Sequence, residues 1–227
     1  MAFRARLLPL LARNVAKEIY IIGRRTQILM QVTISQWESI KQYTAMAFVI
    51  AGIGRIGNET VHHFGTAVGL PVSNVVLDLT LLLTYGGALL GLLGIFFLID
   101  DLSPRLSRTG VLLVGLTSGS IIVSLFGKYV VGGESPQGIL LLIPASFYVF
   151  STLSFLVFGI ASLRTRVPSR GVGYLLLTVV ISRVATVAGM GEFGAVLFII
   201  SMLCIGYLFR QATVHSATGI STNETTA

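Results

Sequence analysis

The chain has 227 residues, of which 54% are hydrophobic and 11% charged, and its mean hydropathy is +0.87. Soluble domains have about 25% charged residues, so this composition excludes an ordinary soluble protein and indicates an integral membrane protein. The net charge of +7 is not interpreted as a sign of nucleic-acid binding, because the positions of the Lys and Arg residues fit a membrane protein. No nucleic-acid partner is expected.

The first 43 residues form the one sizeable segment outside the predicted spans. Apolar residues recur there every four positions with Arg and Lys between them, at Phe3, Leu7, Leu11, Val15 and Ile19. This pattern predicts a basic amphipathic helix on the membrane surface, attracted to anionic lipid headgroups. An alternative start of the protein at Met30 or Met46 is also considered. A cleavable signal peptide is not expected, because the apolar stretch 7–12 is short and is followed by basic residues.

Residues 44–210 are predicted to form an all-α transmembrane bundle of about six spans. A spanning helix needs roughly 20 mostly apolar residues. Four segments meet this requirement easily: 79–99, 110–126, 138–162 and 191–209. The segment 171–190 is long enough but carries Arg183, and the segment 44–64 is apolar only in its first half. Residues 211–227 are rich in Ser and Thr and are predicted to be disordered.

The positions of Lys and Arg favour six spans with both chain ends in the cytoplasm. In that topology thirteen of the sixteen basic residues lie in cytoplasmic segments, and Lys128 alone lies in an outer loop. Arg55 and Arg183 lie within spans. If residues 44–64 did not cross, the basic N-terminal segment would lie opposite the other basic loops, against the positive-inside rule. We therefore expect a multi-pass protein of the cell membrane.

A glycine motif offers a different interpretation of the first predicted span. Gly52, Gly54 and Gly57 match the G-x-G-x-x-G pattern of dinucleotide sites, and Asp78 follows 26 residues after Gly52. With strands at 47–51 and 72–77, this segment resembles the nucleotide-binding domains attached to potassium transport systems. The uncharged run that follows Asp78 is typical of a membrane helix, which disfavours a nucleotide-binding segment at 52–57.

A second copy of the same pattern lies between the last two predicted spans, at Gly189, Gly191 and Gly194. Glycines are expected at a tight turn, and we interpret this copy as such a turn. Two further glycine pairs have four-residue spacing: Gly87 with Gly91, and Gly115 with Gly119. Small residues at this spacing let helices approach closely in lipid. They predict packing within the bundle or, alternatively, a homo-oligomer.

Four ionisable residues form the candidate intramembrane polar cluster: Arg55, Glu59, Asp78 and Arg183. A charge in the hydrocarbon is costly unless it has a partner or water. Arg55 and Glu59 are four residues apart, so they share a helix face and are expected to pair. Arg183, roughly midway along its predicted span, is expected to pair with Glu59 or Asp78.

Two functions remain open for this cluster. If its members are paired and sealed, the protein is structural or accessory, which we favour, because buried pairs often fix helix register. If they line one continuous cavity, the protein is a small transporter or channel with a polar path for an anion or protons through spans one, two and five.

No catalytic residue, metal ligand or cofactor is expected. His62 and His63 are adjacent, so on a helix their side chains diverge by about 100° and do not chelate one ion together. The single cysteine, Cys204, lies in an apolar run and cannot form an internal disulfide or a Cys-ligated zinc site. The chain also contains no spacing of acid, base and nucleophile that is typical of a hydrolase.

One stretch is typical of a known group of proteins. Residues 158–176 read FGIASLRTRVPSRGVGYLL, in which a span ends in G-I-A-S-L-R and a short basic loop leads to a Gly-led apolar span. With Asn58 and a following His near the first span, and with Gly206–Tyr207 in the last, the chain resembles small uncharacterised multi-span membrane proteins of archaea and actinobacteria. The resemblance covers residues 46–210 and implies six spans but no activity; the basic leader before Met46 departs from it.

Overall fold

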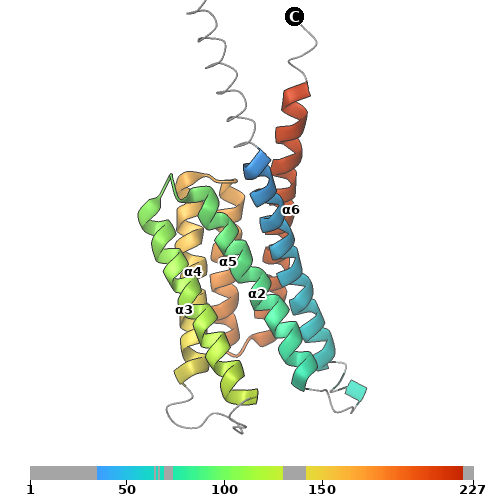
Figure 1. Cartoon of the computed structure of the whole chain (residues 1–227). Coiled ribbons are helices and arrows are strands. Elements are labelled where there is room, and N and C mark those ends of the chain that lie inside the picture. Colours follow the sequence, from blue (N-terminus) through green and yellow to red (C-terminus); the bar gives the residue numbers. More distant parts are fainter. Residues whose placement is uncertain (1–34, 64, 66, 69–73, 130–141, 222–227) are drawn as a thin grey trace, which may run out of the picture. The chain divides into compact units, whose positions relative to one another are not determined.

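The fold is given by a computed structural model that describes residues 35–63, 65, 67, 68, 74–129 and 142–221 (Figure 1). The chain divides into two units, Met1–Ser39 and Ile40–Ala227, and all the labelled helices belong to the second. The amphipathic helix predicted from Phe3 to Ile19 and the terminal residues 222–227 lie outside the described residues.

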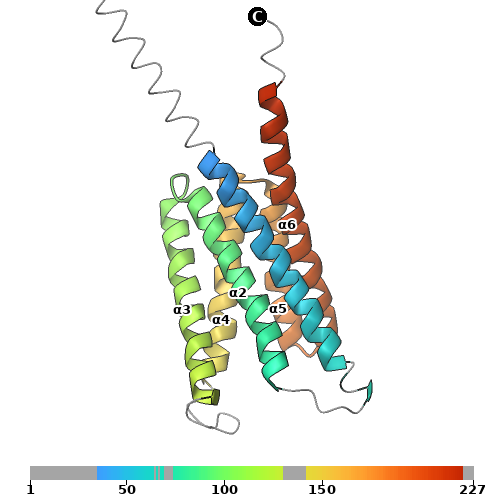
Figure 2. The same cartoon turned by 45° about the vertical axis from the view of Figure 1, so that its right-hand side comes forward.

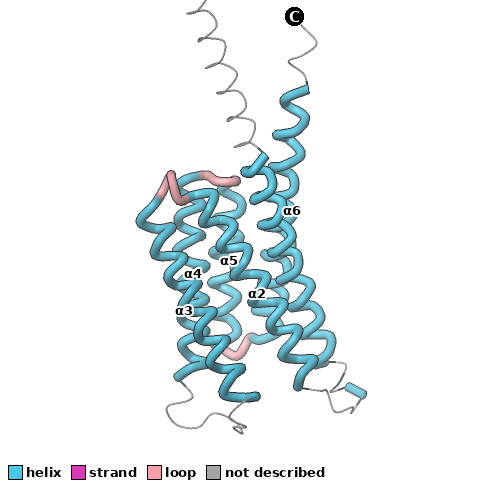
Figure 3. The backbone as a smooth tube through the Cα atoms, viewed as in Figure 1, coloured by secondary structure: helices cyan, strands magenta, loops and turns pink. Residues whose placement is uncertain are grey.

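The described residues form helices, with short loops at 100–103, 166–169 and 188–190 and without a strand among them (Figure 3). An N-terminal helix covers residues 35–63. It is followed by α2 (Asn74–Ile99), α3 (Pro104–Tyr129), α4 (Leu142–Thr165), α5 (Arg170–Val187) and α6 (Gly191–Ser221). Helices α2 to α6 are each long and apolar enough to cross a membrane. The predicted all-α fold is confirmed for the described residues, and its five strongest candidate spans coincide with these five helices.

The C-terminal ends of α5 and α6 differ from the prediction. Helix α5 ends at Val187, three residues earlier than expected, because Gly189 adopts a φ of +87° that favours glycine and begins the turn into α6. The tight turn predicted at this glycine motif is therefore confirmed. Helix α6 continues to Ser221, so residues 211–221 are helical where disorder was predicted. Extending an existing helix needs no new nucleus, and these residues have no proline to stop it.

The N-terminal helix runs antiparallel to α2 at very short range. A Cβ added at Gly94 would come 1.9 Å from the Thr44 Oγ1 atom, and one added at Gly87 would come 2.7 Å from the Ala47 carbonyl oxygen. Further along, a Cβ at Gly54 would come 2.8 Å from the Thr84 amide nitrogen. Helices approach each other this closely in lipid where one of them has a glycine, which has no side chain.

The nucleotide-binding interpretation of this segment is wrong. Residues 47–51 are α-helix and not strand, and Gly52, Gly54 and Gly57 lie within the same helix. A helix satisfies all its backbone hydrogen bonds within the segment, whereas a strand would need partners. Gly54 instead admits the backbone of α2, and Gly52 admits the side chain of Leu203 from α6. These glycines serve helix packing.

The N-terminal helix also runs antiparallel to α6, and in Figures 1 and 2 it lies beside both α2 and α6. A Cβ at Gly206 would come 3.0 Å from the Ala45 carbonyl oxygen, and the rings of Phe48 and Phe209 stack with their centroids 6.2 Å apart. On the other side of the bundle, Gly159 of α4 faces Gly173 of α5 at similarly short range. These glycines therefore lie where neighbouring helices come closest.

The helices alternate in direction, so the bundle has two distinct ends (Figure 1). We call them the Gly189 end, which holds the turn between α5 and α6, and the Arg170 end, which holds the loop between α4 and α5. The start of the second unit and the last residues of α6 lie at the Arg170 end. So do the basic residues Arg105, Arg108, Arg164, Arg166 and Arg170, which flank its two loops. Lys128, in the last turn of α3, lies at the Gly189 end.

Candidate functional site

Arg183 is the most deeply buried charged side chain among the described residues, with 6% of its surface exposed. Arg183 was predicted roughly midway along its span. It lies thirteen residues after Arg170 and four before Val187, the two ends of α5, so it is closer to the Gly189 end of the helix than to its middle. A buried guanidinium is costly unless other groups replace the water it loses. Its surroundings therefore define the candidate site.

Aromatic rings from three other helices surround this guanidinium. The Cζ atom of Arg183 lies 4.7 Å from the ring centroid of Tyr85 in α2 and 5.5 Å from that of Phe198 in α6. Helix α4 contributes Tyr148 at 5.5 Å and Phe147 at 5.8 Å. All four distances are within the roughly 6 Å range of cation–π attraction, which is strengthened when the cation is desolvated. The rings thus offset part of the cost of burial.

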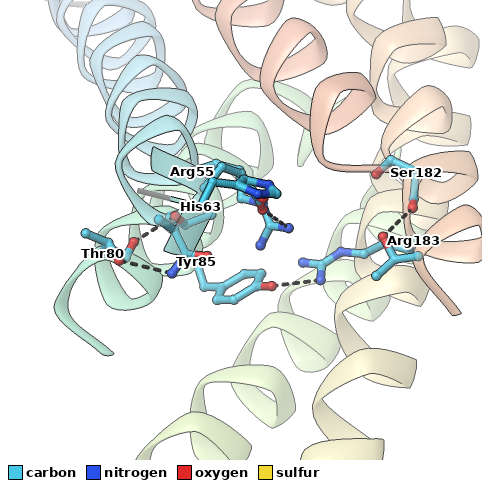
Figure 4. Close-up of polar contacts among 10 residues, drawn as sticks. Arg55, His63, Thr80, Tyr85, Ser182 and Arg183 are labelled. Atoms are coloured by element: carbon cyan, nitrogen blue, oxygen red, sulfur yellow. Dashed lines mark hydrogen bonds and ion pairs between the residues drawn. The ribbon is translucent and has the colours of Figure 1, made fainter. Parts of the chain in front are cut away.

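The hydrogen bonds of Arg183 are far from complete. Its Nη1 atom donates to the Tyr85 hydroxyl over 3.1 Å (Figure 4). Its Nε and Nη2 atoms are buried and have no hydrogen-bond partner among the described residues. Because a guanidinium carries five N–H groups, of which Nε and Nη2 hold three, most of its donor capacity is unused.

The expected ion pair between Arg183 and Glu59 or Asp78 is not formed, so that prediction is wrong. Glu59 is held by Arg55, one turn away on its own helix, with Nη2 and Oε1 2.5 Å apart, as the i,i+4 spacing predicted. Asp78 lies seven residues before Tyr85, about 10 Å along α2, and pairs with Lys128 of α3 over 2.5 Å. Both carboxylates are therefore satisfied elsewhere.

Arg55 and Arg183 meet at a cavity of about 20 Å³. Its other lining residues come from α2, α4, α5 and α6: Thr84, Tyr85, Tyr148, Ser182, Thr186, Gly194, Ala195 and Phe198. The Nε atom of Arg55 is also buried without a partner among the described residues. Two guanidinium groups thus line this cavity and no carboxylate is among its lining residues; Arg55 is paired with Glu59, so the lining has an excess of positive charge.

A second cavity, of about 160 Å³, lies between α2, α3 and α4. It is lined by Asp78, Leu81, Leu82, Tyr85, Ser120, Ile121, Ser124, Leu125 and Phe147. Tyr85 lines both cavities, and its ring packs edge-on against Phe147 with the centroids 4.7 Å apart. The four residues of the predicted cluster therefore do not line one cavity. Arg55 and Arg183 line the first, Asp78 lines the second, and Glu59 lines neither of these two.

The aromatic residues of this site were not predicted from the sequence. Tyr85 and Tyr148 place a hydroxyl inside otherwise apolar segments, and a buried Tyr hydroxyl usually has a partner. This preference was the one signal in the sequence for these residues, but it does not identify the partner of either hydroxyl. The partner depends on how α2, α4 and α5 pack, and the sequence alone does not fix this packing.

The remaining candidate residues form no further site. His63 lies against Glu59, with Nε2 and Oε2 3.5 Å apart, and the described residues hold no group of three His, Cys, Asp or Glu side chains that could bind a metal. Cys204 is exposed on α6. Comparison of the chain with protein-family models, with curated proteins and with solved structures finds no match. The site is therefore interpreted from its own chemistry.

Proposed function

We propose that this chain is a six-span membrane protein with both ends in the cytoplasm that binds an anionic group between Arg55 and Arg183. One observation carries the binding function: a guanidinium only 6% exposed has three N–H groups without a partner among the described residues. A carboxylate or phosphate accepts two parallel hydrogen bonds from a guanidinium, and such charge-assisted bonds are the strong ones. The excess positive charge of the cavity favours an anion as well.

A purely structural role for Arg183 is less consistent with these contacts. A cation that only fixes helix register would be expected beside a carboxylate, as Arg55 lies beside Glu59. Aromatic rings attract the charge of Arg183 but do not accept its N–H groups as an anion would. Binding is also favoured over conduction, because the cavity of about 20 Å³ has room for about one water molecule or one oxygen of an anion, so the rest of the anion has to displace the Tyr85 hydroxyl from Arg183. We infer a ligand site and not an open path.

The six-span topology is supported by the N-terminal helix. It packs antiparallel to α2 from Thr44 beside Gly94 to Gly57 beside Thr80. This distance is about 20 Å along the helix, about two-thirds of a hydrocarbon core of about 30 Å, which favours a crossing by this helix beside α2. Six spans are also what the resemblance to the small membrane proteins implies. The basic residues of the Arg170 end favour a cytoplasmic position for that end, by the positive-inside rule.

Cysteine labelling tests the topology. On a Cys204→Ser background, a cysteine at exposed Met190 should react with an impermeant maleimide added to intact cells, and a cysteine at exposed Asp101 should react only after permeabilisation. Labelling in the opposite order would overturn the proposed orientation.

Thermal unfolding in a neutral detergent tests anion binding. With a dissociation constant of about 1 mM, 10 mM phosphate would stabilise the protein by about 1.4 kcal/mol and raise its unfolding temperature by about 3 to 6 °C. Sodium chloride, whose anion has no pair of oxygens to accept two parallel hydrogen bonds, keeps the ionic strength constant. Arg183→Gln should abolish this rise, whereas Arg210→Gln, which removes the same charge at an exposed position, should preserve it.

The comparison requires that Arg183→Gln is folded, so the unfolding temperature of this variant without phosphate is measured first. If Arg183→Gln does not fold, Arg183→Lys replaces it, because Lys keeps the charge but cannot donate two parallel bonds. A rise that is equal in wild type and either folded variant would reject the anion site and favour a structural or accessory protein.

A further inference from the structure

The cavity between α2, α3 and α4 is next to the arginine site and has a different character. Tyr85 lines both cavities, and Phe147, whose ring is 5.8 Å from the Arg183 Cζ atom, lines the larger one. The two side chains are the wall between a cationic cavity and a mainly apolar one. A ligand that occupied both would carry an anion at one end and an apolar group at the other.

Three of the four polar residues that line the larger cavity, Asp78, Tyr85 and Ser120, already have partners within the protein. Asp78 accepts hydrogen bonds from Lys128 and Tyr129, and Ser120 donates to the Leu116 carbonyl and lies 3.2 Å from the Ser146 hydroxyl. The remaining lining is mostly aliphatic or aromatic, and Ser124, which is exposed, lies at its edge. A cavity whose polar groups are satisfied internally favours an apolar guest over water.

The volume and position of this cavity restrict the guest. About 160 Å³ is similar to an apolar cavity of about 150 Å³ that holds benzene, so a chain of several carbons fits. Leu82 lines the cavity and is 46% exposed, on a helix that is apolar enough to cross the membrane. The cavity is thus open to the lipid side of the bundle, from which an apolar chain can enter.

We propose that the ligand of this protein is an amphiphile from the bilayer, with a phosphate or carboxylate bound by Arg183 and Arg55 and the start of its apolar chain in the cavity between α2, α3 and α4. The proposal rests on the anion site proposed above. An anion that takes the Arg183 Nη1 donor replaces the Tyr85 hydroxyl there. Tyr85 is then released from Arg183, and the wall between the two cavities can move aside.

Binding of inorganic phosphate and hexyl phosphate to the full-length protein in neutral detergent tests this proposal. Each buried methylene is expected to strengthen binding about four-fold. Hexyl phosphate should therefore bind at least about ten-fold more tightly than inorganic phosphate, because two or more methylenes enter the cavity. Arg183→Gln should abolish the binding of both.

Substitutions that fill the cavity locate the chain. Ser124→Trp should remove the advantage of hexyl phosphate and leave inorganic phosphate unchanged, whereas Val123→Trp should alter neither, since Val123 is exposed and lies outside the cavity lining. Leu82→Trp provides a second filling variant if Ser124→Trp does not fold. Equal affinities for the two phosphates, or an advantage that survives both fillings, would overturn the chain site and leave the anion site in place. Binding of neither phosphate would reject the anion site itself, and the amphiphile with it.

Discussion

Helices α2 and α3 are both 26 residues long, and each carries two glycines four residues apart, yet the two pairs have different surroundings. Gly87 and Gly91 lie against the N-terminal helix, whereas a Cβ at Gly115 or Gly119 would meet nothing within 4 Å. In keeping with this, half of the apolar, membrane-spanning part of α2 is buried within the protein, against 17% of that of α3. Glycine spacing thus shows that a close approach is possible, and the neighbouring helix decides whether it is used.

The largest effect is expected at Gly87. Gly87→Leu would push a side chain into the backbone of the N-terminal helix, where the Ala47 oxygen and the Ala51 nitrogen lie within 2.8 Å of the new Cβ. Overpacking of this kind costs about 3 kcal/mol. The matched control is Gly86→Leu, one residue away on the same helix with nothing within 4 Å, for which we expect less than about 0.5 kcal/mol. SDS titration in mixed micelles measures both; similar losses would contradict the packing described for α2.

An intermediate effect is expected where the two helices are joined. Asp78 at the start of α2 accepts hydrogen bonds from Lys128 and Tyr129 at the end of α3. The Lys128 side chain is 41% exposed, so solvent screens the pair and its coupling energy should be only about 0.2 to 1 kcal/mol. A double-mutant cycle with Asp78→Asn and Lys128→Gln measures this coupling. A value of zero would mean that the pair of Asp78 with Lys128 does not hold α3 to α2.

The smallest effect on folding is expected at the glycines of α3. Gly115→Leu and Gly119→Leu should each change the free energy of unfolding by less than about 0.5 kcal/mol, because the added side chain enters open space. Cross-linking in membranes shows whether a second copy of the chain or lipid covers the face of α3 that carries these glycines. Loss of a cross-linked dimer in these variants would support the homo-oligomer that the spacing predicts, whereas an unchanged pattern would indicate lipid.

The sequence predicts features that depend on distance along the chain. The spans follow from runs of apolar residues, and the pair of Arg55 with Glu59 follows from the helical repeat. The partners of Arg183 and Asp78 lie 98 and 50 residues away from them, so they depend on which helices are neighbours. The candidate site was therefore predicted in its charged members but not in its aromatic wall or in the division into two cavities.

The position of Arg183 near the end of its helix has an electrical consequence. It lies four residues before the end of α5, about 6 Å, or about a fifth of a hydrocarbon core of about 30 Å. In the proposed orientation, an anion arriving from outside would cross that fraction of the transmembrane voltage. At 100 mV, negative inside, this costs a monovalent anion about 0.5 kcal/mol, so its affinity for the site should change only about two-fold when the membrane is depolarised.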